Sequence, residues 1–177
     1  MRLMIRTAAA LAAFLIAAPL AAQETALPEE PDSVLGSITG TLDLRPAEWR
    51  VMENTEGGGS HWSREEATLS VRMDGILDGV GDASRLVISF DLAGPESSVV
   101  PTDIYIALTH PDFDEPLVAM GDDISLEITA VTQLSDDMVI AGGVNALLQV
   151  PGSESDENDV TLDGNFQVTL PREEDEA

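Results

Sequence analysis

Apolar residues recur at every second position through much of the chain. From Val160 to Leu170 every even-numbered position is apolar or glycine, and every odd-numbered position is polar. A helix would scatter these apolar side chains around its circumference, whereas a strand places all of them on one face. The segment is therefore predicted to be a strand with one buried face.

The same alternation predicts further strands, and two of these runs depart from strict alternation. The runs cover residues 34–42, 67–73, 86–92, 124–130 and 138–150, with shorter runs at 49–51 and 104–108. The pair Gly142–Gly143 interrupts the longest run and predicts either a bulge or a bend there. Ile104 to Leu108 is nearly all apolar, which predicts a strand that is covered on both faces.

Turn-forming clusters separate these runs and set the fold class. They lie at residues 54–60, 78–84, 94–98, 121–123 and 151–159. The last cluster joins the two longest runs, which we expect to form an antiparallel hairpin. The only helical element considered is one turn near Trp62 to Glu66. We predict an all-β, single-domain antiparallel β-sandwich or flattened barrel of about 8–10 strands.

The N-terminal residues have the layout of a cleaved export signal. Arg2 and Arg6 precede an apolar run from Ala8 to Ala18, and the small residues Ala21 and Ala22 follow. The run is shorter than the roughly 20 residues that a membrane-crossing helix needs. We predict a signal peptide at 1–22, a flexible acidic leader at 23–32, the β-domain at 33–170 and an acidic tail at 171–177. The product is then expected to be periplasmic or secreted.

The exported chain is strongly acidic and has no cysteine. The full sequence has 8 Lys+Arg, 33 Asp+Glu and a formal net charge of −25. Loss of the signal removes two Arg, which leaves 6 Arg against 33 acids and a formal charge of −27. Nucleic acid and anionic membrane surfaces repel such a polyanion, so we expect neither as a partner. Without Cys there is no disulfide, thiol nucleophile, Cys-bound metal or lipid-modified N-terminal Cys, so the chain is not expected to be a lipoprotein.

Four strand patterns resemble those of a known group of proteins. A Gly-x-Ile-x-Gly-Thr-Leu opening at residues 36–42 precedes the Trp-containing strand at Glu48 to Arg50. Later come Leu-x-Ile-x-Phe at residues 86–90 and Gly-x-Phe-x-Val at residues 164–168. This is similar to small exported β-rich proteins of Gram-negative bacteria, a group without an assigned activity. The resemblance implies export and a β fold, and it carries over no catalytic residue.

Acidic residues in two predicted loops are the candidate metal ligands. Asp112 and Asp114 lie in one loop, and Asp156 and Asp159 lie in the other. Ca²⁺ takes about six to eight oxygen ligands, so closely spaced acids suit it. However, the six pairs of acids two residues apart are no more than chance gives at this acid content, and none fits an EF-hand loop. We expect no cofactor, with weak Ca²⁺ binding by these four residues as the alternative.

Signals for catalysis are weak. There is no GxSxG elbow, and Ser60 and His61 are neighbours that a strand would point apart. His110 precedes Asp112, but the other histidine lies in a different predicted loop, which leaves a transition-metal site one donor short. We expect a turn built on Pro111 at this position instead.

Two aromatic residues are the candidates for ligand contact. Trp62 and Phe113 fall in predicted loops, whereas Trp49, Phe90 and Phe166 share the inward phase of their strands. We expect an exported noncatalytic binding or envelope-associated module with a protein or glycan partner, while the oligomeric state is left open. The alternatives are a Ca²⁺-dependent binding module that uses the acidic loops and, third, a carboxylate-based hydrolase.

Overall fold

Antiparallel strands carry most of the residues described by the structure, a computed structural model. The described residues are 33–55, 58–80, 83–94, 99–153 and 159–173, and they belong to one compact unit, Pro31–Ala177. The predicted signal peptide and leader, and most of the predicted tail, lie outside the described residues. Across the described ranges no helix has the length and apolar character needed to cross a membrane.

Most of the strands occupy the segments in which apolar residues alternate, whereas β3, β4 and β5 form outside them. Their bounds are β1 Val34–Leu42, β2 Arg45–Met52, β3 Asn54–Thr55, β4 Gly58–Gly59, β5 His61–Glu65, β6 Thr68–Leu77, β7 Arg85–Ala93, β8 Val100–Thr109, β9 Leu117–Met120, β10 Ile124–Leu134, β11 Asp137–Leu148 and β12 Val160–Pro171. A short 3₁₀ turn at Gly121–Asp123 leads into β10.

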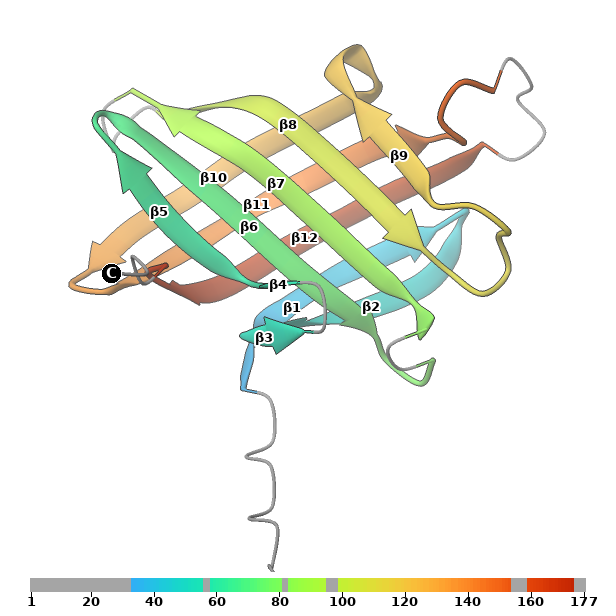
Figure 1. Ribbon diagram of the computed structural model, residues 1–177, viewed down its shortest axis with the longest axis horizontal. Helices are drawn as coiled ribbons and strands as arrows, with labels where there is room; N and C mark the ends of the chain where they lie inside the picture. The colour runs from blue at the N-terminus through green and yellow to red at the C-terminus, as the bar shows by residue number, and fades with distance from the viewer. Residues whose placement is uncertain (1–32, 56–57, 81–82, 95–98, 154–158, 174–177) are drawn as a thin grey trace, which may run out of the picture. The chain divides into compact units, whose positions relative to one another are not determined.

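Ten of the described strands form one antiparallel sheet. Its order is β10-β11-β12-β1-β2-β6-β7-β8-β9, and β5 pairs with the first half of β6. The short strands β3 and β4 pair only with each other. Figure 1 shows β5 to β9 as one layer and β10, β11, β12, β1 and β2 as a second layer behind it, with the strands of the two layers crossing.

Contacts at both margins of the sheet nearly close it into a flattened barrel. Val118 in β9 and Gln149, just after β11, exchange two backbone hydrogen bonds of 2.8 Å. At the other margin Trp62 in β5 bridges to Arg172, and the Glu173 amide donates to the Trp62 carbonyl over 2.8 Å. The predicted all-β antiparallel fold is confirmed.

The interior is filled by the inward faces of the strands. Strand β12 alternates between buried and exposed residues from Val160 to Leu170, as predicted, and its antiparallel pairing with β11 confirms the expected hairpin. The burial of apolar area on this scale is the main stabilising contribution to the fold. The expected two-sided burial of residues 104–108 is wrong, because Ile106 and Leu108 are fully buried while Tyr105 is exposed on the outer face.

The expected helical turn and loop around Trp62 are also wrong. Residues His61–Glu65 form β5, which pairs with β6 from His61↔Arg72 to Glu65↔Thr68. A positive φ of 52° at Glu66 turns the chain between these strands. Trp62 then faces inward, where burial of its large apolar surface stabilises the strand more than any local preference for a helical turn.

The Gly142–Gly143 pair lies opposite a bulge instead of forming one. Strand β11 continues through both glycines, and the register shift falls in the neighbouring strand β10, between Ile128 and Ala130. A Cβ on Gly142 would lie 2.6 Å from Cζ of Phe166 and closer still to the Glu127 carbonyl oxygen. Glycine is therefore required at residue 142 because of close packing.

The β1–β2 turn holds two non-glycine residues in left-handed backbone conformations. Asp43 has a φ of 48° and Leu44 a φ of 63°, as in the tight hairpin turns that favour Asn-Gly. Leu44 is 86% exposed, so no burial of its side chain offsets this strain. The left-handed conformation of Leu44 therefore lowers the stability of the fold.

Replacing Leu44 with glycine is expected to raise the free energy of unfolding by about 1 kcal/mol, because glycine adopts positive φ without a steric penalty. Leu134→Gly is the matched control, since Leu134, the last residue of β10, is also exposed (56%) but has no positive φ. The control should lower the free energy of unfolding by about 0.5–1 kcal/mol. Urea unfolding followed by circular dichroism measures the free energy of unfolding of both variants. If Leu44→Gly is no more stable than the unsubstituted chain, the claim that Leu44 strains the turn is wrong.

Candidate ligand-binding site

A cavity of about 580 Å³ opens at one end of the barrel, and we name it the mouth cavity. Four segments border it: the β1–β2 turn, the end of β6, the β8–β9 loop and the start of β12. Its volume is in the range of pockets that hold small organic ligands. The apolar lining residues are Leu42, Pro46, Ala47, Leu77, Phe113 and Val160, and the polar ones are Asp43, Arg45, Glu48, Asp78, His110, Asp112 and Asp159.

Strand register brings these turns to the same end of the barrel. Leu42 pairs with Leu162 of β12 and with Arg45 of β2. The Asp43 amide donates to the Thr161 carbonyl over 2.8 Å, which fixes the β1–β2 turn to β12. Because strand pairing and this hydrogen bond hold the rim, the cavity is largely formed before any ligand arrives.

A second backbone hydrogen bond fixes the other side of the rim. The Asp78 amide donates to the Glu48 carbonyl over 2.9 Å, so the end of β6 is held against β2. The Arg50 guanidinium lies 3.4 Å from the Asp78 carboxylate, and both side chains are largely exposed. This ion pair neutralises part of the charge of Asp78 but contributes little to stability.

The carboxylates of the mouth cavity differ in how far they are engaged. Asp159 accepts a hydrogen bond of 2.9 Å from the Gln149 side-chain amide. By contrast, the side chains of Asp43, Arg45 and Glu48 have no hydrogen bond or ion pair with any other residue in the described part of the chain. Their charges therefore remain available to a ligand.

The β8–β9 loop contributes the aromatic wall of the cavity. The Phe113 amide donates to the His110 carbonyl over 3.0 Å, which forms the turn expected around Pro111. The Asp112 amide donates to Nδ1 of His110 over 3.2 Å, and the His110 and Phe113 rings pack with centroids 5.8 Å apart. Phe113 is thus held at the cavity edge, partly packed against the core.

The four predicted metal ligands are placed in different surroundings. Asp112 lines both the mouth cavity and a smaller neighbouring cavity of about 290 Å³, Asp114 lines only the smaller one, and Asp159 lines only the mouth cavity. Asp156 lies outside the described residues. Within the described ranges no three His, Asp or Glu side chains converge as a metal-binding group.

The two aromatic residues predicted to contact a ligand also lie in different surroundings. Phe113 lines both cavities, whereas Trp62 is 1% exposed and packs in the core. Nε1 of Trp62 donates to the Asp136 carbonyl over 3.2 Å, and the Arg172 guanidinium lies 5.6 Å from the ring centroid. The indole of Trp62 is therefore used to hold the β5 margin of the barrel closed.

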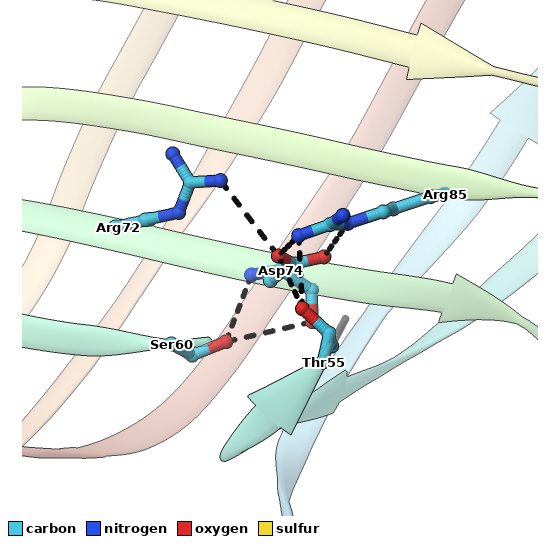
Figure 2. Close-up of polar contacts among 5 residues, drawn as sticks. All are labelled: Thr55, Ser60, Arg72, Asp74 and Arg85. Atoms are coloured by element: carbon cyan, nitrogen blue, oxygen red, sulfur yellow. Dashed lines mark hydrogen bonds and ion pairs between the residues drawn. The ribbon is translucent and has the colours of Figure 1, made fainter. Parts of the chain in front are cut away.

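Asp74 forms a second polar cluster, on the outside of β6. Figure 2 shows its carboxylate between Arg85 and Thr55, with Arg72 farther away. Nε of Arg85 donates to Asp74 over 2.6 Å, a second guanidinium nitrogen also contacts the carboxylate, and Oγ1 of Thr55 donates to it over 2.9 Å. The hydrogen bond to Asp74, helped by the carboxylate charge, raises the pKa of Arg85 in spite of partial burial.

Ser60 completes this cluster at a gap in the sheet. β5 pairs with β6 up to Arg72, and β2 pairs with β6 from Gly75, so Asp74 falls between the two partner strands. Oγ of Ser60 accepts from the Asp74 amide over 2.8 Å and donates to its carbonyl over 3.5 Å. Asp74 is fully buried and satisfied by these partners, which is the arrangement of a structural clamp.

No protein-family model, no curated protein and no solved structure matches the chain.

Proposed function

We propose that the chain is an exported, noncatalytic binding module and that the mouth cavity is its ligand site. The observation that carries the proposal is a cavity of about 580 Å³ with an apolar wall and a polar rim, held by strand pairing and two backbone hydrogen bonds. Binding sites for small molecules combine these features: apolar walls supply affinity, and a few polar groups fix orientation. The predicted export signal supports a role outside the cytoplasm.

The carboxylate-based hydrolase stays an alternative, which needs two carboxyl groups at a suitable separation in the site. Of the two aromatic candidates for ligand contact, Trp62 lies in the core and Phe113 lines the cavity. Ca²⁺-dependent binding by Asp112, Asp114, Asp156 and Asp159 remains a separate prediction. Calorimetric titration with Ca²⁺ tests it, because saturable submillimolar binding with a thermal shift would favour that alternative.

Protein-observed NMR tests the proposed site. The ¹⁵N-labelled exported chain is titrated with a set of small amphiphiles of positive, neutral and negative charge. We expect the perturbed amides to cluster on the four segments that border the mouth cavity, because a ligand held there contacts all of them. Perturbations confined to other surfaces, or none with any member of the set, would contradict the proposal.

A cavity-filling substitution provides the matched variant. Ala47→Trp places a large side chain in the mouth cavity and is expected to abolish the perturbations. Ala93→Trp introduces the same residue at an exposed position that does not line the cavity and should leave them unchanged. Both variants are first shown to be folded by the dispersion of their amide resonances.

A further inference from the structure

We infer that the mouth cavity selects an organic cation with an apolar body, a conclusion that rests on the function proposed above. Five acidic residues line the cavity, against the single basic residue Arg45. The Asp78 carboxylate is partly neutralised by Arg50, whereas the side chains of Asp43 and Glu48 have no ion pair or hydrogen bond with another described residue. A cavity lined by this excess of acidic over basic residues attracts cations and repels anions.

The apolar side chains of the lining favour a cation that also carries apolar surface. Leu77, Phe113 and Val160 lie on three different segments of the lining, so apolar surface is spread around the cavity. A ligand that covers these side chains gains affinity in proportion to the apolar area that it removes from water. The Phe113 ring adds a second attraction, because an ammonium group is stabilised over an aromatic face.

The placement of the acids favours a diffuse charge over a metal ion. Asp43 belongs to the β1–β2 turn, Asp78 follows β6, and Asp112 lies in the β8–β9 loop, so the carboxylates surround the cavity from separate segments. Ca²⁺ needs several oxygens within about 2.6 Å of one point, and no three acidic or histidine side chains of the described residues converge in this way. A quaternary ammonium ion gives up its weak hydration readily and responds to the summed field of dispersed carboxylates.

A series of short-chain probes tests this inference by isothermal titration calorimetry on the exported chain. Hexyltrimethylammonium carries a positive charge, hexanol none and hexanoate a negative charge, on linear alkyl chains of five or six carbons. We expect hexyltrimethylammonium to bind at least tenfold more tightly than either of the others, and its affinity to fall as salt is added.

The double variant Asp43→Asn/Glu48→Gln removes the two unpaired charges while keeping the side-chain volumes. Asn tolerates the positive φ of residue 43, so the turn is preserved. This variant should weaken hexyltrimethylammonium about tenfold and leave hexanol unchanged. Glu127→Gln is the control, because Glu127 is exposed on β10 and does not line the cavity.

The possible outcomes test the class of ligand and the location of the site separately. Equal or tighter binding of hexanol or hexanoate overturns the cation inference and leaves the mouth cavity as the proposed site. Absence of binding by hexyltrimethylammonium also overturns the inference, while the NMR titration still decides the proposed function. Cation binding that survives Ala47→Trp overturns both, because the ligand then lies elsewhere.

Discussion

Replacing Asp74 with asparagine is expected to lower the free energy of unfolding by about 3–5 kcal/mol, because it leaves a partly buried guanidinium without its counter-charge. Asp74 is fully buried, and Arg85 directs two nitrogens toward its carboxylate. Thr55 also loses its charged acceptor, which loosens the β3–β4 hairpin over β6. Chemical denaturation followed by tryptophan fluorescence measures the loss.

Two further variants separate this clamp from ordinary surface charge effects. Asp78→Asn breaks the exposed ion pair with Arg50 and should cost less than about 1 kcal/mol. The double variant Asp74→Asn/Arg85→Met also removes the charge of Arg85, though not that of Arg72, and should recover part of the loss. If Asp74→Asn is no more destabilising than Asp78→Asn, the buried cluster does not hold the hairpin.

Gly142→Ala is expected to destabilise the barrel by about 3 kcal/mol or more, because the added methyl group has no space. It would meet the Glu127 carbonyl of β10 and the Phe166 ring of β12 together, so neither neighbour can move away freely. Thermal or urea unfolding of the purified variant gives the change in the free energy of unfolding.

Gly143→Ala is the matched control from the adjacent position. A Cβ at residue 143 would lie 3.4 Å from Oδ1 of Asn165 and 3.7 Å from the Gly164 carbonyl oxygen, which are ordinary contacts. Its effect should stay within about 0.5 kcal/mol, as for other substitutions without a clash. Equal effects of the two substitutions would show that loss of glycine flexibility, and not the close packing at Gly142, is responsible.

The long strands were predictable because they bury one face. The alternation in residues 160–170 specifies which side chains point inward, and a shift of one residue would expose all of them. The hairpin between β11 and β12 followed from the turn cluster that joins two long runs. Trp62 was misplaced because glycine and charged residues around it indicate a loop, whereas burial of its indole depends on the distant residues Asp136 and Arg172.

The candidate site was predictable only in part. Phe113, Asp112 and Asp159 were identified from their loops, but the sequence gives no sign that these loops meet the β1–β2 turn and the end of β6. That meeting depends on strand order, in which β1 lies between β12 and β2. The glycine-rich segment around Thr55 likewise gave no indication that it covers Asp74, since the contact joins residues 19 positions apart across a sheet face.

A crystal structure of the exported chain with hexyltrimethylammonium tests the central claim most directly. We predict the ligand in the mouth cavity, with its ammonium group toward Asp43 and Glu48 and its alkyl chain against Leu77 and Phe113. An empty mouth cavity at a saturating ligand concentration, or the ligand bound on another face of the barrel, would contradict it.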